Sequence, residues 1–174
     1  MTFNLTELSS LTHRTGDPQP VRVLLLCVGN SARSIMAEAL LRQEGGDRFL
    51  VRSAGSAPKG VNPLSLRVLD DRGISTTGLS SESVAVYQHE PWDYAITLCD
   101  EAREACPYLP GAHEMLHWDL PDPAAVEGDE ATRLEAFRAV LDSLQAHLES
   151  FIPPALERGV QLEPRAGRPA SRVP

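Results

Sequence analysis

A nearly continuous apolar run, Val21-Arg22-Val23-Leu24-Leu25-Leu26, comes shortly before a segment of strong helix formers at residues 34–44. Such runs are typical of parallel strands that are buried on both faces, because a strand with one wet face would alternate apolar and polar residues. Gly45 and Gly46 then end the predicted helix. Strand, turn and helix in this order predict an α/β fold that begins with a βαβ crossover.

The rest of the central sequence repeats this alternation. We predict further strands at residues 49–53, 92–98 and 115–118, and helices at residues 64–72 and 129–151. The last helix carries a core-facing stripe of apolar residues, three and four positions apart: Leu134, Phe137, Leu141, Leu144, Leu148 and Phe151. The predicted fold class is therefore α/β, a single three-layer domain with a four-stranded parallel sheet flanked by helices. Ligands of such folds bind at the carboxyl ends of the strands.

Both ends of the 174-residue chain depart from this pattern. Residues 1–19 are polar and show no sustained period, and residues 153–174 are rich in proline, glycine and arginine. Segments with so few apolar residues are usually disordered. We therefore predict an N-terminal tail at residues 1–19, one catalytic domain at 20–152 and a disordered C-terminal tail at 153–174.

The charge balance narrows the choice of partners. The chain has 16 Lys and Arg against 24 Asp and Glu, a net charge of −8, and no basic stripe. Nucleic acids and anionic membranes are therefore poor candidate partners. No segment reaches the roughly 18 apolar residues of a membrane span, and the N-terminus does not resemble a signal peptide. We expect a cytoplasmic protein, whose three cysteines are free, catalytic or metal-bound rather than structural bridges.

The segment Cys27-Val28-Gly29-Asn30-Ser31-Ala32-Arg33-Ser34 lies between the first strand and the first helix. A loop of this length can curl so that successive backbone amides point inward, and the positive end of the following helix adds to them. We expect the residues from Val28 to Ser34 to surround a tetrahedral oxyanion. Arg33 would hold two of its oxygens through the planar guanidinium group.

Cys27 begins this loop, where the groups that attract an anion would also stabilise a thiolate. We predict that Cys27 is the nucleophile, that Asn30 holds a left-handed turn, and that Ser34 both caps the helix and hydrogen-bonds the thiolate. The alternative is a buried cysteine followed by an ordinary turn and an unrelated arginine. The combination of cysteine, small residues, arginine and serine between a strand and a helix argues against it.

With this loop the sequence resembles the low-molecular-weight tyrosine phosphatase superfamily, whose loop is cysteine, five residues, arginine, then serine or threonine. More narrowly, it resembles the thioredoxin-coupled arsenate reductases built on that fold. The likeness extends from about Val21 to Phe151 and includes Ser-Ala-Gly at 53–55, Ile-Thr-Leu-Cys-Asp-Glu-Ala at 96–102 and His-Trp-Asp-Leu-Pro-Asp-Pro at 117–123. The resemblance implies reduction of arsenate to arsenite for arsenic detoxification, with phosphate and sulfate as competing oxyanions and weak phosphatase activity.

Asp122 is the predicted general acid. A thiolate that attacks a tetrahedral anion displaces an oxygen, which is a poor leaving group until it is protonated. Asp122 is followed by Pro123, and the resembled families carry an Asp-Pro on a loop over the pocket. Asp119 is a nearby competitor, but no proline follows it.

Cys99 follows the strand at residues 92–98, so it should emerge at the same sheet edge as Cys27. Cys106 stands seven positions later. If the intervening segment is helical, about 10 Å separates the two thiols, too far for a disulfide without unwinding. The resemblance implies a relay: Cys27 binds arsenate, Cys99 attacks Cys27, Cys106 attacks Cys99, and thioredoxin reduces the final disulfide.

Cys99 and Cys106 also have two simpler interpretations. They are small buried hydrophobes in one of these, and in the other they bind zinc together with His113 and His117. The six residues between the two cysteines exceed the usual spacing of zinc ligands, which argues against zinc. His117 is otherwise expected to pack within a strand. The other histidines are expected at the surface: His13, His89 and His147.

Asn30, Glu38 and Ser53 match positions that coordinate a potassium ion in some members of the resembled family. The chemistry itself requires no cofactor, so potassium is the one ion that the resemblance adds. A solvated helix glutamate and an ordinary serine at a strand end are the simpler interpretation of these residues.

The main rival function is a phosphatase, because arsenate and phosphate share shape and charge. A phosphatase needs neither Cys99 nor Cys106, and Ala124 stands where the tyrosine phosphatases typically have tyrosine. Ala32, at a position that is often a second cysteine in both families, does not distinguish them. Two further rivals are a route that transfers a low-molecular-weight thiol onto arsenate, using the nucleophile alone, and a non-catalytic oxyanion sensor. The extra cysteines and the candidate acid argue against both.

Overall fold

The computed structural model describes residues 18–106 and 108–161. Four strands form one parallel sheet in the order β2-β1-β3-β4: β1 (Val21–Cys27), β2 (Phe49–Gly55), β3 (Trp92–Thr97) and β4 (Ala112–His117). The predicted α/β class and the four-stranded parallel sheet are confirmed. From β1 the chain first adds β2 on one side and then returns to add β3 on the other side. The direction in which strands are added therefore changes between β1 and β3. Ligands in such sheets bind beyond the carboxyl ends at this reversal.

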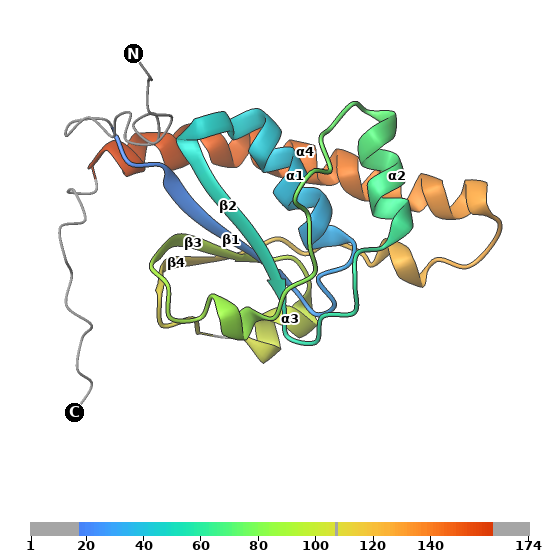
Figure 1. Ribbon diagram of the computed structural model, residues 1–174, viewed down its shortest axis with the longest axis horizontal. Helices are drawn as coiled ribbons and strands as arrows, with labels where there is room; N and C mark the ends of the chain where they lie inside the picture. Colours follow the sequence, from blue (N-terminus) through green and yellow to red (C-terminus); the bar gives the residue numbers. More distant parts are fainter. Residues whose placement is uncertain (1–17, 107, 162–174) are drawn as a thin grey trace, which may run out of the picture.

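Three helices lie together on one side of the sheet (Figure 1): α1 (Arg33–Gly45), α2 (Pro63–Asp71) and α4 (Glu130–Gln161). α1 packs against β1 and β2, and α4 packs against α1 and α2. A shorter helix, α3 (Asp100–Ala105), lies near the carboxyl ends of the strands. Three short 3-10 segments complete the chain: η2 (Gly46–Arg48), η3 (Val84–Val86) and η4 (Pro123–Ala125). None of the described helices is long and apolar enough to cross a membrane.

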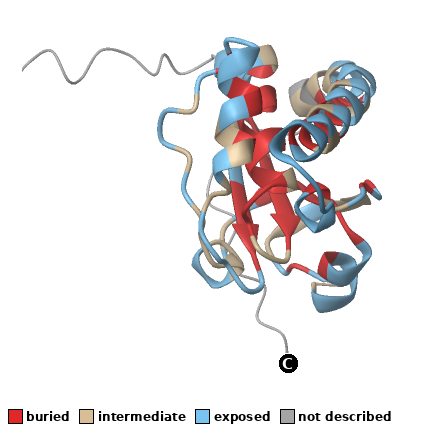
Figure 2. Cartoon of the chain, turned by 90° about the vertical axis from the view of Figure 1, so that its right-hand side faces the viewer, coloured by how far each residue is buried: buried red, intermediate tan, exposed pale blue. Residues whose placement is uncertain are grey.

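β1 contributes residues to the two larger hydrophobic clusters of the described domain. Val23 and Leu25 belong to the large core that the helices cover, whereas Leu24 and Leu26 belong to a smaller cluster on the opposite face, together with residues near η3 and after α3. Figure 2 shows the buried residues concentrated in the sheet and on the inner sides of the helices. Burial on both faces explains the nearly continuous apolar run in the sequence.

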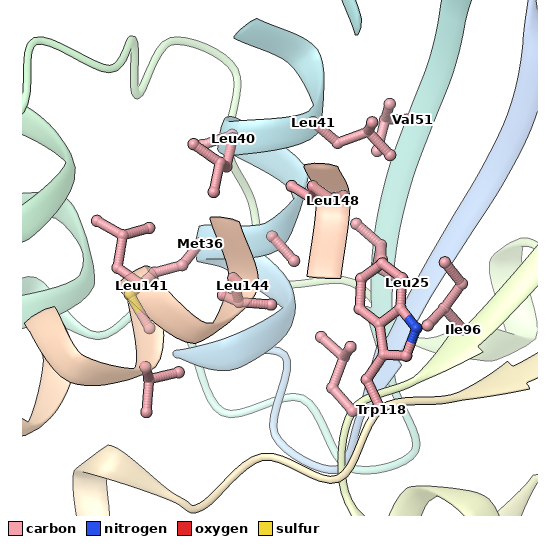
Figure 3. Packing of buried hydrophobic residues seen from close by; sticks show 14 of the residues in the cluster. Leu25, Met36, Leu40, Leu41, Val51, Ile96, Trp118, Leu141, Leu144 and Leu148 are labelled. Atoms are coloured by element: carbon pink, nitrogen blue, oxygen red, sulfur yellow. The ribbon is translucent and has the colours of Figure 1, made fainter. Parts of the chain in front are cut away.

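The large core lies between the sheet and the long helix. In Figure 3, Leu25 and Ile96 of the sheet lie near Leu144 and Leu148 of α4, and all four side chains are fully buried. The stripe that the sequence predicted on the last helix is therefore confirmed as a core-facing surface. It fixes the sheet against the helices and holds the ends of β1 and β3 in place.

Most predicted boundaries are close to the observed ones, with larger differences at the start of β4 and at the end of α4. This strand begins at Ala112, three residues before the predicted start at Met115. β4 is an edge strand that pairs only with β3, so it tolerates polar residues that a central strand would exclude. The exposed His113 and the half-buried Glu114 lie in this added part. Hydrophobic pattern alone therefore missed the first half of the strand.

The predicted end of the domain at residue 152 is wrong, because α4 continues through Pro153 and Pro154 to Gln161. Both prolines are exposed, and packing of the following turn outweighs the backbone hydrogen bonds that they cannot donate. Ala155 is buried in the core, and Arg158 forms an ion pair with Glu114 of β4 at 2.8 Å. Residues 153–161 are thus helical rather than a disordered tail. The other tail predictions, for residues 1–17 and 162–174, lie outside the described residues.

Candidate functional site

The loop after β1 has the predicted form. Cys27 is the last residue of β1, and Arg33 is the first residue of α1. Asn30, between them, is fully buried and has φ of +41°, the one positive φ of a non-glycine residue in the described part of the chain. Its side-chain Oδ1 accepts a hydrogen bond from the backbone N–H of Glu82 at 2.6 Å. The predicted left-handed turn at Asn30 is therefore confirmed, and the hydrogen bond to the Asn30 side chain stabilises it.

Gly55 at the end of β2 lets this loop pack closely against the sheet. It pairs in register with Cys27, and a Cβ atom at this position would lie 2.4 Å from the carbonyl oxygen of Val28. Any side chain would therefore push the loop away from β2. In the sequence, Gly55 stood out only as part of the Ser-Ala-Gly motif at 53–55, and this contact was not predicted.

Ser34 hydrogen-bonds the nucleophile but does not cap the helix. Its Oγ lies 2.8 Å from Cys27 Sγ, while the Nδ2 of Asn30 donates to the same Oγ at 2.9 Å. Because Nδ2 already donates to this oxygen, the hydroxyl proton of Ser34 is free to point at the sulfur. The N-cap position is Ala32, whose side chain makes no capping hydrogen bond, so the predicted capping role of Ser34 is wrong.

Arg33 and Asp122 face each other across a pocket of about 580 Å³ that opens above Cys27. Arg33 Nη1 donates to the carbonyl oxygen of Leu120 at 3.0 Å, and Nη2 lies 3.8 Å from Asp122 Oδ2. The other carboxylate oxygen of Asp122 accepts a hydrogen bond from the N–H of Ala124 at 3.0 Å. The predicted nucleophile, anion-binding arginine and general acid therefore line one pocket.

Lys59 is a pocket residue that the sequence analysis missed. It lies in the loop after β2, and its side chain passes beside Gly29, where an added Cβ atom would meet Lys59 Cε at 2.7 Å. Its ammonium group brings a second positive charge to a pocket that already contains Arg33. Because the carboxyl ends of parallel strands meet at one edge, the loop after the second predicted strand could have been expected here.

Asp119 also lines the pocket, but its setting differs from that of Asp122. It stands with Asp100 and His117 in a group whose candidate ligand atoms all lie within 4.8 Å of one another. His117 Nδ1 lies 2.8 Å from Thr97 Oγ1, and Nε2 lies 3.2 Å from Asp100 Oδ1. His117 therefore does more than pack within a strand. The contact with Arg33 places the Asp122 carboxyl beside the predicted anion-binding group, the position that a proton donor to the anion requires.

Cys99 joins Cys27 at the bottom of the pocket. The two residues form one small buried cluster with Ala102, and Cys99 is only 1% exposed. Burial raises the pKa of the Cys99 thiol, although hydrogen bonds from the backbone of Ala102 and Val28 and the charge of Arg33 act in the opposite direction. Cys99 is thus favoured as a neutral thiol in the resting protein.

Cys106 lies at the other end of α3, in a different cluster. α3 begins directly after Cys99 and ends directly before Cys106, so the segment between them is helical, as the distance argument assumed. Cys106 packs against the smaller hydrophobic cluster, and burial raises its pKa. All three cysteines are free. Within the described residues, Cys99, Cys106, His113 and His117 do not form a metal-binding group, so the zinc interpretation is not supported.

The three residues predicted for potassium converge behind the loop. Asn30 Nδ2 donates to Ser53 Oγ at 2.9 Å, and Ser53 Oγ donates to a carboxylate oxygen of Glu38. All three side chains are buried. Asn30, Glu38 and Ser53, which the resemblance grouped, therefore lie together in the structure.

A thiol, an arginine and a carboxylic acid around one oxyanion pocket at the carboxyl edge of a parallel sheet define a cysteine-dependent oxyanion enzyme. A family profile described as low molecular weight phosphotyrosine protein phosphatase matches residues 22–162. The chain belongs to this family.

Several named relatives and solved structures that resemble this chain are arsenate reductases. An arsenate reductase of Halalkalibacterium halodurans is 34% identical over 129 residues, covering 74% of this chain and 93% of that protein. A solved arsenate reductase in its phosphate binding state aligns with a TM-score of 0.67 and 26% identity, covering 78% of this chain and 98% of that one. The thioredoxin-dependent arsenate reductase of Corynebacterium glutamicum aligns with a TM-score of 0.57 and 31% identity, covering 77% of this chain and 63% of that longer one.

Proposed function

We propose that this protein reduces arsenate to arsenite through a relay of three cysteines, with thioredoxin as the final reductant. The observation that carries this proposal is the position of the thiols. Cys27 and Cys99 share one buried cluster at the pocket, and Cys106 stands one short helix away. A phosphatase needs only the first of these thiols. The identity to arsenate reductases supports the same choice.

Cys27 performs the first step. Its thiolate attacks arsenic and forms a sulfur–arsenic bond, while one arsenate oxygen leaves as water after Asp122 supplies a proton. Ser34 stabilises the thiolate through the hydrogen bond at 2.8 Å. Arg33 and Lys59 hold the remaining oxygens of the anion, and the inward amides of the loop share their charge.

Cys99 then carries out the redox step. Its sulfur attacks Cys27 Sγ as the thiol proton passes to an oxygen on arsenic, and the sulfur–arsenic bond breaks with its electron pair remaining on arsenic. Arsenic is thereby reduced from the pentavalent to the trivalent state and leaves as arsenite, while a Cys27–Cys99 disulfide forms. The raised pKa of Cys99 keeps this thiol neutral before arsenate arrives, so premature oxidation is slow.

Cys106 moves the disulfide away from the pocket. Its thiolate attacks Cys99 Sγ, Cys27 leaves as a thiolate ready for another arsenate, and a Cys99–Cys106 disulfide forms. α3 must unwind for this bond, because the helical geometry holds the two residues about 10 Å apart. A dithiol of thioredoxin then transfers two electrons to the disulfide. Tyr108, 72% exposed and two positions after Cys106, offers an aromatic contact for that partner.

The test is arsenate-dependent NADPH oxidation with thioredoxin and thioredoxin reductase. Cys27→Ser should abolish all arsenite formation. Cys99→Ser and Cys106→Ser should each stop multiple turnover, and Cys106→Ser should still release about one equivalent of arsenite per enzyme. Full multiple turnover by Cys106→Ser would contradict the relay. Multiple turnover by Cys99→Ser with a low-molecular-weight thiol and another redoxin would indicate the route that needs Cys27 alone.

A phosphatase is the second candidate, supported by the family and by a pocket that suits phosphate as well as arsenate. It would form a phosphocysteine on Cys27, which water hydrolyses. Hydrolysis of p-nitrophenyl phosphate at rates typical of an enzyme, unchanged in Cys99→Ser and Cys106→Ser, together with absent arsenate turnover would favour it. We expect only weak hydrolysis. The reducing cytoplasm is the location that suits three free thiols and a thioredoxin partner.

A further inference from the structure

A buried ionic network lies directly behind the anion loop. Glu38 on α1 is 3% exposed, and its side chain accepts hydrogen bonds from Ser53 on one oxygen and from Arg42 on the other. Arg42 stands one helical turn after Glu38 and is partly exposed. A hollow of about 360 Å³ beside these residues is also lined by Arg52, Glu82 and others. The guanidinium group of Arg42 thus takes the carboxylate oxygen of Glu38 that Ser53 leaves open.

The side chains here do not present the oxygen cage that a potassium ion needs. Asn30 turns its Nδ2 donor towards Ser53 and Ser34, and its only side-chain oxygen accepts the N–H of Glu82. Ser53 donates its hydroxyl proton to Glu38. A cation would have to break several of these bonds to find lone pairs. The residues therefore do not fit the potassium ion that the sequence resemblance implied.

The network needs a positive charge for a physical reason. A buried carboxylate without a partner is very unfavourable, and it becomes protonated unless a cation compensates it. Burial is the largest influence on the pKa of Glu38 and leaves it raised, although the hydrogen bond from Ser53 and the charges of Arg42 and Arg52 act in the opposite direction. Arg52 is exposed, and within the described residues its guanidinium group donates to the carbonyl oxygen of Val51 instead of this carboxylate. Arg42 is the cation in direct contact.

The charge of Glu38 reaches the nucleophile through a chain of hydrogen bonds. Ser53 donates to Glu38, so its oxygen accepts from Asn30 Nδ2 at 2.9 Å. The same Nδ2 group donates to Ser34 Oγ at 2.9 Å, and Ser34 Oγ lies 2.8 Å from Cys27 Sγ. Each donor is oriented by the next acceptor along the chain. If Glu38 were neutral and carried the proton, Ser53 would turn and the loop would lose this orientation.

We propose that Arg42 is a built-in cation of this protein. It takes the place of a bound monovalent metal ion as the partner of Glu38, and it thereby holds the hydrogen-bond chain that positions Asn30 and Ser34 around the Cys27 thiol. Arg42 touches neither substrate nor sulfur, so it is a positioning residue. An exposed Glu and Arg one turn apart contribute little to stability. The pair here differs because the carboxylate is buried and belongs to the anion loop.

The first test compares the wild type in potassium chloride and in choline chloride at equal ionic strength. Both measurements use a Cys99→Ser/Cys106→Ser background that keeps the natural Arg42, so that iodoacetamide meets Cys27 alone. The readout is the rate of Cys27 alkylation over a range of pH. This rate does not depend on arsenate reduction. We expect less than a twofold difference between the two salts. Activation of several-fold by potassium, or a higher melting temperature in potassium than in choline, would overturn the proposal. Failure of arsenate turnover would leave this result unaffected.

The second test removes the built-in cation. Arg42→Ala should slow Cys27 alkylation about tenfold in choline chloride, shift its pH midpoint upward, and recover in part when potassium enters the vacated position. Arg42→Lys should remain independent of potassium. Arg67→Ala is the matched control, because Arg67 pairs with Asp71 at the same spacing on the exposed side of α2. Wild-type rates for Arg42→Ala in choline would contradict the proposal.

A double variant keeps the test decisive if Arg42→Ala folds poorly. Glu38→Gln/Arg42→Gln replaces the ion pair by two neutral side chains of similar shape. This variant should fold better than Arg42→Gln alone and should show no response to potassium, because it contains no buried carboxylate to compensate. Equal melting temperatures of Arg42→Gln and the double variant would show that the buried Glu38 carboxylate needs no cation beside it, and would overturn the proposal.

Discussion

Cys99 and Cys106 stand at the two ends of α3, and the six residues of that helix separate them. The N–H of Arg103 donates to the carbonyl oxygen of Cys99 at 3.1 Å, and the N–H of Cys106 donates to that of Ala102 at 2.9 Å. A disulfide between the two cysteines is incompatible with this helix. Reduced and oxidised forms of the protein must therefore differ in backbone structure at α3.

Hydrogen exchange should detect this difference. After one turnover of arsenate without thioredoxin, the amides of α3 should exchange at least about tenfold faster than in the reduced protein, because their helical hydrogen bonds are broken. Mass spectrometry of peptides covering residues 99–106 measures this. Cys106→Ser is the control, since it forms no Cys99–Cys106 bond. Equal protection of α3 in the oxidised and reduced wild type would contradict the required unwinding.

Replacing the general acid should slow the first step. Asp122→Asn keeps the shape of the side chain but cannot supply a proton, so single-turnover formation of arsenite should fall about 100- to 10,000-fold. Rapid-quench measurement with excess enzyme isolates this step. The same substitution at Asp119 should have a clearly smaller effect, because Asp119 does not pair with Arg33. A larger loss of the single-turnover rate in Asp119→Asn than in Asp122→Asn would show that Asp119 is the general acid.

The buried thiol of Cys99 should make the fold sensitive to alkaline pH. Its pKa is higher in the folded protein than in an unfolded chain, so the folded state holds a proton that the unfolded state has lost. This contribution to stability is complete below the usual pKa of a thiol and disappears as the pH rises through the raised value. The free energy of unfolding should therefore fall by at most about 1.4 kcal/mol per pH unit from this group.

Urea denaturation at several pH values from 7.5 upward tests this effect. The slope of stability against pH should be shallower in Cys99→Ala than in the wild type. Tyr87 and Tyr94, whose pKa values are also raised by burial, are present in both proteins and do not affect the difference. A loss of stability that is the same at every pH would indicate a packing defect and no contribution from ionisation.

The last turns of α4 should be necessary for full stability. A chain that ends at residue 152 loses the buried Ala155, the packing of Leu156 and the ion pair of Arg158 with Glu114. We expect its free energy of unfolding to be lower by about 2–4 kcal/mol, measured by urea denaturation. A chain that ends at residue 161 serves as the control and should match the full-length protein. Equal free energies of unfolding for the two truncated forms would show that the stable domain ends before Pro153 and would contradict this prediction.

The sequence predicted the parts of the fold that depend on local order. The run before Cys27 could be recognised as a buried central strand, and the loop to Arg33 follows from residue types within eight positions. Tertiary packing decided the features that were missed. Pro153 and Pro154 normally end a helix, but here the turn after them is held by the core and by β4.

The same limit applied to the site. Lys59 has no neighbouring motif in the sequence, and only the shared edge of the sheet brings it to the pocket. Glu38 and Arg42 have the spacing of an ordinary surface ion pair, so sequence alone cannot distinguish a solvated pair from a buried one. Gly55 stands at a strand end, where glycine is common. Its close approach to Val28 depends on strand register.

Cys106 packs into the smaller hydrophobic cluster, away from the thiol that it must attack. Forming the final disulfide removes Cys106 from that cluster. The stability that the domain loses in this way makes the disulfide easier to reduce, so the reduction potential of the pair depends on the conformational stability of the domain. Every 1.4 kcal/mol of fold stability lost on oxidation raises the potential by about 30 mV. The oxidised enzyme is therefore a stronger oxidant. Refolding of α3 after reduction favours the transfer of two electrons from thioredoxin to the Cys99–Cys106 disulfide.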